Sequence, residues 1–584
     1  MDSVHDDVKQ NASHVETCPA TTTKMDTEAG NVAEPVRLTW RSYAVFTAVT
    51  FGLALEVLVI VSGGQVLSFI ARDLGEPSLV GWVVQAPLLM QSALSPLIGR
   101  LSDTLGRKYV AAIPPLVAAM GAILSARATS MGMLIGGSVL WGVTLTTAPV
   151  LRAIATEIMP LKYRVYTNAS AFAAGAIGGT VGSLAAGALV NASPSGWRNI
   201  FWVHLALHLT ASASILGFYN PRRVRHRETK WTSLLWALDP VGSLLFVVGA
   251  TLVLLALNWS GSTYVWGDAH IIAPLTAGVV LLGTFGVYEW KGRNDGVLPH
   301  VLFQNGRNFP LASLVLIVEG WVYYGVINNV LPRMFLHLGF ARDSLRISVL
   351  LLSYGLPTIF ACIPVAIYTT KTKDFRLPLI ISYLLFAATT VSYANITPQW
   401  KSAFLGINVV SGIANSGPLA VLMAALQYSA PHAHLSTATG CGLSARALGG
   451  ALGSAVFTVI LNNELETWSA SVVKAAVTAG MPRSSSKALV VAMNTEQGFD
   501  KVPGLTEKAL HAAEETGRLI YSHAFRMAWW SVFAAGILAL ICVVFLSKID
   551  KNRMTNEIEA TVEKVQPGGD RVELGDTKDF VARD

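Results

Sequence analysis

The residues of this chain that could do chemistry are ionisable side chains set within long apolar stretches. Glu56 lies in FGLALEVLVIV, Glu319 in LVLIVEGWVYY and Arg446 in GLSARALGG. Placing such a group inside a membrane costs about 2.5–3.5 kcal/mol on insertion scales, so each marks a candidate functional site. A carboxyl group there can take up and release a proton as its access to water changes. The three residues predict proton coupling or, alternatively, a fixed interhelical pair in which Arg446 neutralises one acid.

Aromatic and amide side chains are the candidates for lining a ligand cavity. Gln85 and Asn415 lie midway along apolar stretches, and a denser group follows Glu319, namely Trp321, Tyr323, Tyr324 and Asn328. Stacking and amide hydrogen bonds suit an amphipathic organic ligand. Two other roles stay open, because aromatic residues also anchor helices at the membrane surface and amides also bond neighbouring helices.

The elements that carry these residues must be membrane-spanning helices. Only 14% of the 584 residues are charged and 52% are hydrophobic, whereas soluble chains carry about 25% charge. A hydrocarbon core about 30 Å thick takes roughly 20 apolar residues to cross. We find fourteen such runs: 43–65, 79–99, 109–126, 131–151, 170–190, 199–219, 240–259, 270–288, 309–331, 347–369, 377–394, 403–427, 436–461 and 527–547. The sequence predicts an all-helical integral membrane protein and argues against a soluble multidomain protein.

The short loops predict how these spans are oriented. Lys and Arg concentrate in the loops after even-numbered spans, as in 100–108 and 222–230, and such loops stay in the cytosol. Both termini are then cytosolic, and the connection 462–526 lies outside the cell or in a lumen. We expect the plasma membrane, with a vacuolar or vesicle membrane as the alternative.

Cysteine and histidine spacing predicts no metal site. The cysteines stand apart at Cys18, Cys362, Cys441 and Cys542, and His204 with His208 has no evident third ligand. The net charge of +7 comes from cations scattered between apolar runs. We therefore attribute it to membrane topology and expect no nucleic-acid partner.

An internal repeat predicts how the spans are grouped. The octet Ala176–Ser183 recurs 271 residues later as Ala447–Ser454, with five of eight positions identical. The octets fall in the fifth helix of two six-helix sets, and parallel repeats of this kind are typical of secondary transporters. We expect the following organisation: a disordered cytosolic tail 1–42, a six-helix bundle 43–219, a cytosolic linker 220–239, two inserted helices 240–288, a cytosolic linker 289–308, a second six-helix bundle 309–547 with external loop 462–526, and a cytosolic tail 548–584.

Both octets carry glycines four residues apart, Gly178 with Gly182 and Gly449 with Gly453. This spacing flattens one face of a helix and permits close packing. These faces either only pack or also slide and bend during a conformational change.

The connection between the second and third spans reads GRLSDTLGRK. Gly99 and Gly106 permit a tight connection, and Asp103 can pair with neighbouring cations such as Arg107 or with helix ends. A solvated cytosolic turn would explain the charges alone. It would not explain why two glycines bracket the acid.

That loop resembles the signature between the second and third helices of the major facilitator superfamily. Further segments are similar to its fourteen-span drug:proton antiporter group: Trp82, Gly196–Trp202, Asp239-Pro240 and Arg446–Gly450. Others are similar to the fungal branch that contains trichothecene efflux pumps and siderophore-iron transporters: Val318–Gly320, Gln427–Pro431, Ile549–Lys551 and Met554–Asn556. The resemblance covers residues 40–555.

The resemblance implies roles for several residues. Asp103 and Arg107 would belong to a cytosolic latch that breaks and reforms between the halves. Glu56 matches the first-span acidic position, which usually carries Asp. Two positions depart from the antiporter pattern: Ser138 stands where the fourth span has its Arg, and Ser183 replaces the Pro of the fifth-span motif. Arg152, near the cytosolic end of the fourth span, need not substitute for the missing Arg.

The leading hypothesis is a proton-coupled exporter of a small amphipathic organic compound, such as a toxin, secondary metabolite or drug. No GxxxxGK[ST] motif is present, so we expect no nucleotide and no other cofactor than the proton gradient. We expect a monomer in the lipid bilayer and no enzymatic activity. The alternatives are a proton-coupled importer of ferric siderophores with the same fold, a non-transporting membrane sensor and a membrane-embedded enzyme.

Overall fold

The chain is helical throughout the part that the structure describes. The computed structural model describes residues 38–74, 79–192, 195–221, 236, 238–260, 264–304, 306–341, 344–495, 499–549, 554–555 and 558. Within them no strand forms, and β-type pairing is confined to an isolated bridge between Ser260 and Tyr264. The predicted tails and the linker 220–239 lie mostly outside these residues, so their assignments, including the disorder of 1–42, stay predictions.

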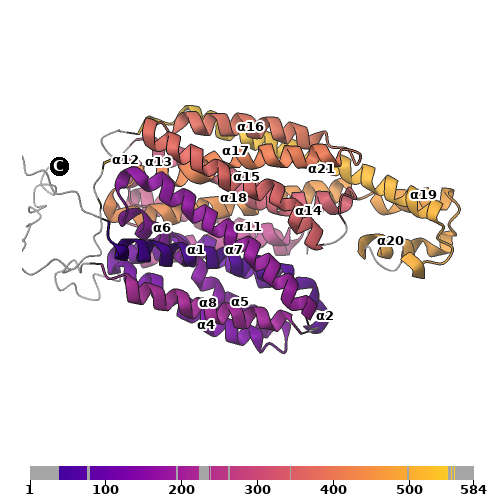
Figure 1. Cartoon of the computed structure of the whole chain (residues 1–584), viewed down its shortest axis with the longest axis horizontal. Coiled ribbons are helices and arrows are strands. Elements are labelled where there is room, and N and C mark those ends of the chain that lie inside the picture. Colours follow the sequence, from indigo (N-terminus) through magenta and orange to yellow (C-terminus); the bar gives the residue numbers. More distant parts are fainter. Residues whose placement is uncertain are drawn as a thin grey trace, which may run out of the picture. The chain divides into compact units, whose positions relative to one another are not determined.

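The first half of the helical region contains the helices expected from the first six apolar runs (Figure 1). They are α1 (Trp40–Gln65), α2 (Leu67–Leu74), α3 (Trp82–Leu105), α4 (Arg107–Ala126), α5 (Met131–Gly142), η1 (Val143–Thr147), α6 (Ala148–Glu157), η2 (Leu161–Tyr163), α7 (Arg164–Ala192) and α8 (Trp197–Phe218). The fourth run is thus one continuous path, α5–η1–α6, tightened at its centre into a 3₁₀ turn.

Two inserted helices precede the second half. They are α10 (Pro240–Trp259) and α11 (Ala269–Gly292), which pack along each other. The second half comprises α12 (Val301–Gln304), α13 (Asn308–Gly320), the π-helix η3 (Trp321–Ile327), α14 (Asn328–His337), α15 (Ser344–Thr372), α16 (Arg376–Ala394), α17 (Lys401–Ser429), η4 (His432–His434), α18 (Leu435–Glu464), α19 (Trp468–Thr478), η5 (Arg483–Ser485), α20 (Ser486–Thr495), η6 (Phe499–Lys501) and α21 (Glu507–Val544).

Twelve helical segments of the described residues are long and apolar enough to cross a membrane. Of the fourteen predicted spans, 79–99 and 309–331 are helical but fall outside this set. The first corresponds to α3, whose apolar character is diluted by Gln85, Gln91 and two prolines. The second is divided into α13, η3 and α14. The protein is therefore a multi-pass membrane protein, whereas the count of fourteen stays a prediction.

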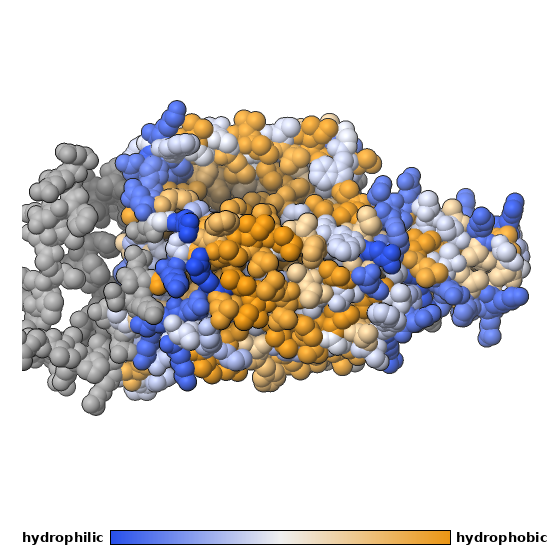
Figure 2. All heavy atoms as spheres, turned by 90° about the horizontal axis from the view of Figure 1, so that it is seen from above, coloured by the Kyte–Doolittle hydropathy of each residue, from blue (hydrophilic) through white to orange (hydrophobic). Residues whose placement is uncertain are grey.

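The surface supports a membrane location. Figure 2 shows apolar side chains gathered across the middle of one face, with hydrophilic ones toward both ends of the helices. Large apolar residues are exposed on several helices, including Val280 of α11, Phe360 of α15 and Leu384 of α16. Exposed apolar area of this extent is expected where lipid takes the place of water.

The region predicted as the external loop 462–526 is itself folded. It forms α19, α20 and the first part of α21, which starts at Glu507 because the hydroxyl of Thr506 caps it by accepting from the backbone N–H of Ala509 at 3.2 Å. These helices bury a small core of their own, with Trp468, Val472 and Leu489 among its members. In Figure 1, α19 and α20 extend beyond the ends of the spanning helices.

The repeated octets explain the tightest helix contacts. A Cβ at Gly178 would collide with the carbonyl oxygen of Ala54 in α1, and a Cβ at Gly449 would collide with that of Ile317 in α13. Glycine at both positions lets α7 approach α1 and α18 approach α13 backbone to backbone. Ala54 and Ile317 are 263 positions apart, and so are Glu56 and Glu319. The packing therefore assigns the two acids to equivalent places in the two halves.

We expect Gly178→Ala to destabilise the protein by about 1–3 kcal/mol, because the added methyl group overpacks the α1–α7 contact. The melting midpoint in detergent should fall accordingly. Gly187→Ala in the same helix is the matched control, since a Cβ there meets no atom within 4 Å. Equal midpoints for the two variants would contradict the close contact.

Candidate functional site

The first acid, Glu56, is buried where α1 meets the fourth helical path. Its side chain accepts a long hydrogen bond of 3.4 Å from the hydroxyl of Thr147, at the end of η1. The cation whose charge acts on Glu56 is Arg152 of α6. Arg152 is also buried, yet its Nε and Nη1 atoms have no hydrogen-bond partner among the described residues. Glu56 and Arg152 thus form a loose pair held by charge rather than by direct hydrogen bonds.

The second acid, Glu319, forms a tight pair with Arg446. Nη2 of Arg446 donates to Oε1 of Glu319 at 2.9 Å, and Nε donates to Oε2. The two side chains are only 2% and 5% exposed. The pair joins α13 to α18, and the contact depends on Gly320, because a Cβ there would collide with the carbonyl oxygen of Arg446. Glu319 therefore supplies the charge that pairs with Arg446, and Gly320 leaves the space in which α18 approaches α13.

Aromatic rings surround the two arginines. The guanidinium of Arg446 lies 4.7 Å from the ring centre of Tyr324, 5.0 Å from that of Tyr323 and 5.1 Å from that of Phe172 in α7. Arg152 lies 4.3 Å from the same Phe172 ring. Cations over ring faces are attracted by the ring quadrupole, more so when desolvated. Phe172 therefore brings one buried cation of each half to a single contact point.

The predicted cavity residues are only partly brought together. Tyr323 and Tyr324 pack edge to face at 5.2 Å, and Nη1 of Arg446 donates to the Tyr324 hydroxyl at 3.1 Å. Trp321 starts η3 and packs near Gly453 of α18, with a buried indole nitrogen that has no partner among the described residues. The π-helix thus presents two aromatic residues, Tyr323 and Tyr324, beside the Glu319–Arg446 pair, whereas Trp321 packs against α18 at Gly453. The side chain of Asn328 is outside the described residues.

The two predicted amides have other neighbours. Asn415 is buried in α17, and its Nδ2 atom has no partner within the described part of the chain. Gln85 lies near the start of α3, close to Gly81. Among the described residues, neither amide forms a hydrogen bond with Arg446 or Glu319. Their role in a cavity stays a prediction.

The last turn of α3, in the first half, contacts the start of α18, in the second half. Asp103 accepts from the backbone N–H of Ser436 at 3.2 Å and from both the N–H and the hydroxyl of Thr437 at 2.8 Å. It thereby caps the N-terminus of α18, where unsatisfied N–H groups favour an anion. Gly106 has φ +97°, a backbone conformation that glycine adopts readily, and it separates α3 from α4.

Charges around Asp103 extend this junction. Arg107 lies 3.3 Å from Asp103 and 2.5 Å from the buried Glu157 at the end of α6. Gly99 permits the close approach of α3 and α18, because a Cβ there would collide with the carbonyl oxygen of Ser436. The four residues predicted for a latch, Gly99, Asp103, Gly106 and Arg107, therefore lie together at one contact between α3, α6 and α18.

A second contact between the halves lies at the same end of the bundle. Arg164 at the start of α7 donates to the carbonyl of Gln427 in α17 at 3.2 Å. The amide of Asn168 donates to that of Gln427 at 2.8 Å, and Gln427 donates to the hydroxyl of Thr439 at 3.2 Å. The Gln427–Pro431 segment thus begins with a residue that links α7, α17 and α18.

Three parts of this arrangement have no site role in the sequence-based prediction: Arg152, Phe172 and Gln427. Arg152 was expected at the cytosolic end of a span, but the helical path continues to Glu157 and buries it. A signal for it was present, since it is an arginine within an otherwise apolar stretch. The sequence contains no such signal for Phe172, because a phenylalanine in a membrane-spanning helix has no distinguishing pattern.

The two helical halves, the buried charges between them and the contact of the α3–α4 turn with α18 are features of a membrane transport protein. A family model described as Major Facilitator Superfamily matches residues 44–454. The match covers more than half of the chain, so this protein belongs to the Major Facilitator Superfamily.

Relatives and solved structures agree with that placement. The acurin A biosynthesis cluster transporter of Aspergillus aculeatus is 27% identical, over 73% of this chain and 75% of that protein. Efflux pump FUS6 of Gibberella fujikuroi is 24% identical, over 74% and 77%. The efflux transporter ffsH of Aspergillus flavipes is 23% identical, over 99% and 98%. The relatives therefore include fungal efflux pumps and transporters of biosynthesis clusters.

Two solved structures share the fold. The proton:xylose symporter XylE has a TM-score of 0.53 at 13% identity, covering 90% of this chain and 99% of its own. The human organic anion transporter MFSD10 has a TM-score of 0.52 at 14% identity, covering 86% and 99%. At these identities the likeness shows the fold alone.

We expect Asp103→Ala to loosen the contact between α3 and α18, because charged hydrogen bonds contribute about 1.5–3 kcal/mol each. Spin labels at the exposed Leu105 and Ala433 report the distance across it. Pulsed electron resonance should show a longer, broader distance distribution. Thr104→Ala, which removes only a bond to the carbonyl of Arg100 within α3, should leave the distribution unchanged. The same distribution in both variants would refute the latch contact.

Proposed function

We propose that this protein exports a small amphipathic organic compound in exchange for protons by alternating access. The observation that carries the proposal is the buried charge cluster between the halves, in which Arg152 and Arg446 meet at Phe172 with an acid beside each. Burying four ionisable groups is costly unless their charges are used. The relatives' names as efflux pumps favour export as that use.

The two acids have different parts in this mechanism. Glu319 is held by two hydrogen bonds from Arg446, so protonating it would leave a buried cation alone. Glu56 has only the long bond from Thr147 and the charge of Arg152. Its proton is therefore exchanged at a smaller structural cost. We assign proton loading to Glu56 and a fixed structural charge to the Glu319–Arg446 pair.

Protonation of Glu56 changes the balance of charge at Phe172. With Glu56 ionised, each arginine has an acid and the cluster is neutral. Once Glu56 is protonated, Arg152 keeps two buried donors without partners and lies near the like charge of Arg446. That state favours separation of the halves, and we propose that this separation weakens cargo binding. Proton binding and cargo binding then exclude each other, which is the requirement for exchange.

The aromatic residues of η3 supply the cargo contact. Tyr323 and Tyr324 provide aromatic rings and hydroxyl groups beside Arg446, and Trp321 of the same π-helix has an unpaired indole N–H among the described residues. Such a lining suits a compound that is mostly apolar with a few oxygen atoms. The latch at Asp103 would break as the cytosolic side opens to load cargo. The energy comes from the proton gradient, so no nucleotide takes part, and we place the monomeric transporter in the plasma membrane.

Glu56→Gln should abolish proton-driven export while leaving the protein folded, because glutamine keeps the size of the side chain but cannot ionise. Cells lacking and expressing the wild type are first compared over a panel of fungal secondary metabolites and one ferric siderophore to find the cargo. Its pH-gradient-driven flux is then measured in vesicles. Full gradient-driven export by Glu56→Gln would reject the assignment, and siderophore accumulation by the wild type would reject export.

The pair assignment is tested by removing its members singly and together. Glu319→Gln or Arg446→Gln alone should cost about 3–5 kcal/mol, because each leaves one buried charge without its partner. The double variant should recover most of that stability in thermal melts and surface abundance. If Glu319→Gln is as stable as the wild type but loses gradient-driven flux, Glu319 rather than Glu56 is the proton site.

A further inference from the structure

The two inserted helices lie along the contact between α3 of the first half and α18 of the second. The first of them, α10, packs against both helices. With α3 it forms an edge-to-face contact of Trp259 with Trp82, whose ring centres are 6.2 Å apart. With α18 the contact is apolar, since Val253 and Leu257 belong to one buried cluster with Ala455. The inserted helices are therefore placed where the two halves meet.

The loop that follows α11, residues 293–300, is folded around Glu289. Oε1 of Glu289 accepts from the backbone N–H of Val297 at 2.8 Å, and its backbone carbonyl oxygen lies 2.8 Å from Nε2 of His300. A Cβ at Gly296 would collide with the same carboxyl group. Glu289 is itself buried near the end of α11. The shape of the loop is thus defined by the helix that precedes it.

Asp295 in this loop binds an arginine near the end of α3. Nη2 of Arg100 donates to Oδ1 of Asp295 at 2.6 Å and to its backbone carbonyl at 3.3 Å. The side chain of Arg100 is 6% exposed, whereas that of Asp295 is 64% exposed. Nη1 of Arg100 also lies 3.1 Å from Nδ1 of His434 in η4, directly before α18. Because a guanidinium group only donates, that imidazole nitrogen accepts. One buried cation therefore bonds to the inserted helices and to the second half.

Arg100 lies among the latch residues of α3. Gly99 precedes it, and Asp103 follows three residues later and binds the start of α18 at Thr437. Side chains three residues apart lie on one face of a helix. The bond from Asp295 therefore also fixes the rotation of the turn that directs Asp103 toward α18. A buried arginine that loses a carboxylate is destabilised, which favours movement of this turn toward water.

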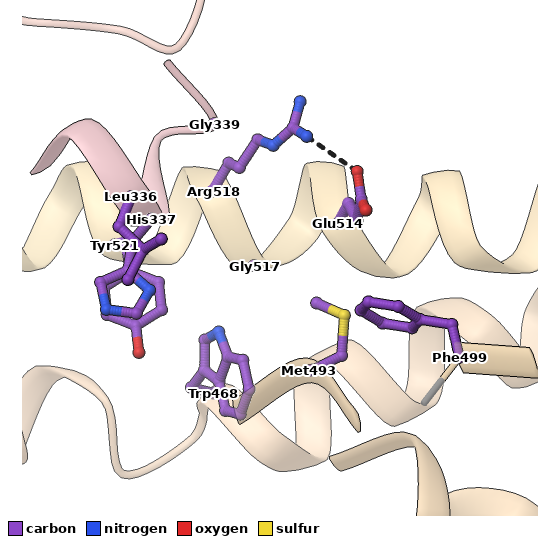
Figure 3. A pocket seen from close by; sticks show the side chains of 10 residues that line it. All are labelled: Leu336, His337, Gly339, Trp468, Met493, Phe499, Glu514, Gly517, Arg518 and Tyr521. Carbon is purple, nitrogen blue, oxygen red and sulfur yellow. Dashed lines mark hydrogen bonds and ion pairs between the residues drawn. The ribbon is translucent and has the colours of Figure 1, made fainter. Parts of the chain in front are cut away.

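The opposite end of the bundle differs in its ion pairs. Among the described residues there, Asp73 pairs with Arg198 within the first half, and Glu514 pairs with Arg518 within the second. Figure 3 shows the second of these pairs, formed by two side chains of the same helix, α21. In the described part of the chain, ion pairs between separate parts of the protein are thus found at the latch end.

We propose that Asp295 is a positioning residue of the latch, through which the inserted helices hold the closed contact between α3 and α18. Its carboxylate keeps Arg100 in place and thereby the last turn of α3. Separation of the halves at this end parts Arg100 from Asp295 or from His434, so this junction sets how readily they separate. The role goes beyond the proposed function, because it requires neither proton coupling nor a direction of transport.

The opening of this end is measured with spin labels at the exposed Tyr109 in α4 and Leu377 in α16, after the four native cysteines are replaced by alanine. Pulsed electron resonance on the full-length protein in nanodiscs separates the closed from the open population. Asp295→Ala should raise the open-to-closed ratio about fivefold, the upper value for a solvent-exposed ion pair.

Asn294→Ala is the matched control. It alters the neighbouring exposed side chain of the same loop, which forms no hydrogen bond among the described residues, and it should keep the wild-type ratio. Equal ratios for Asp295→Ala and Asn294→Ala would overturn the proposal. So would a lower melting midpoint of Asp295→Ala with an unchanged ratio, because the residue would then only stabilise its loop.

Two further variants test whether Asp295 acts through Arg100. Asp295→Glu keeps the carboxylate at an exposed position and should return the ratio to the wild-type value, whereas opening as wide as in Asp295→Ala would overturn the role of the charge. Adding Asp295→Ala to Arg100→Gln should change the ratio less than about twofold, because the bond is already lost. A further fivefold increase would overturn the assignment. Because the readout is a distance, a failure of proton coupling does not affect it.

Discussion

The compensation of buried charge is the constraint on which the arrangement of the second half depends. Arg446 lies on α18 and its acid on α13, so the two helices must come close enough for direct hydrogen bonds. Glycines make that approach possible, Gly320 on one helix and Gly449 on the other, since a Cβ at either would collide with the opposite backbone. The small packing residues and the charged residues are thus parts of one contact. The ion pair requires the close helix approach that the glycines allow, because an uncompensated buried charge costs several kcal/mol.

The two halves satisfy the same constraint differently. Glu56 and Glu319 are equivalent by position, but the residue of the first half that corresponds to Arg446, by the 271-residue offset of the octets, is Gly175. The cation for Glu56 comes instead from another helix, in Arg152 of α6, without a direct hydrogen bond. One half therefore holds a rigid ion pair and the other a loose one. Because the acid is held rigidly in one half and loosely in the other, the two halves are suited to different roles, one structural and one in proton exchange.

Much of the fold and part of the candidate site can be predicted from the sequence. The remaining features cannot, and in each case there is a physical reason. Hydropathy placed the apolar runs, and the octet placed Gly178 and Gly449 in equivalent helices. A fixed pair of Arg446 with one buried acid is one of the two alternatives that the sequence predicts, but the sequence does not decide between Glu56 and Glu319 as the partner. The contact of Arg152 with Phe172 cannot be predicted from the sequence, because it depends on the rotation of α6 and α7 about their axes. The folded region 462–526 was missed because short amphipathic helices with a small core of Trp468 and Leu489 leave no strong periodic signal.

The charge cluster and the latch are joined by two continuous helices. Asp103 binds the first residues of α18, and Arg446 follows about ten residues later on the same helix, roughly 15 Å along its axis at 1.5 Å per residue. Likewise α6 carries Arg152 and ends at Glu157, which pairs with Arg107 of the latch. A helix moves as a unit over such distances, so displacing either end moves the arginine that contacts Phe172. The two cations that meet between the halves are thus the ones whose helices end at the latch. Under the proposed function, a change of protonation at Glu56 would therefore be coupled to a change of contact at Asp103 through Arg152 on α6 and Arg446 on α18.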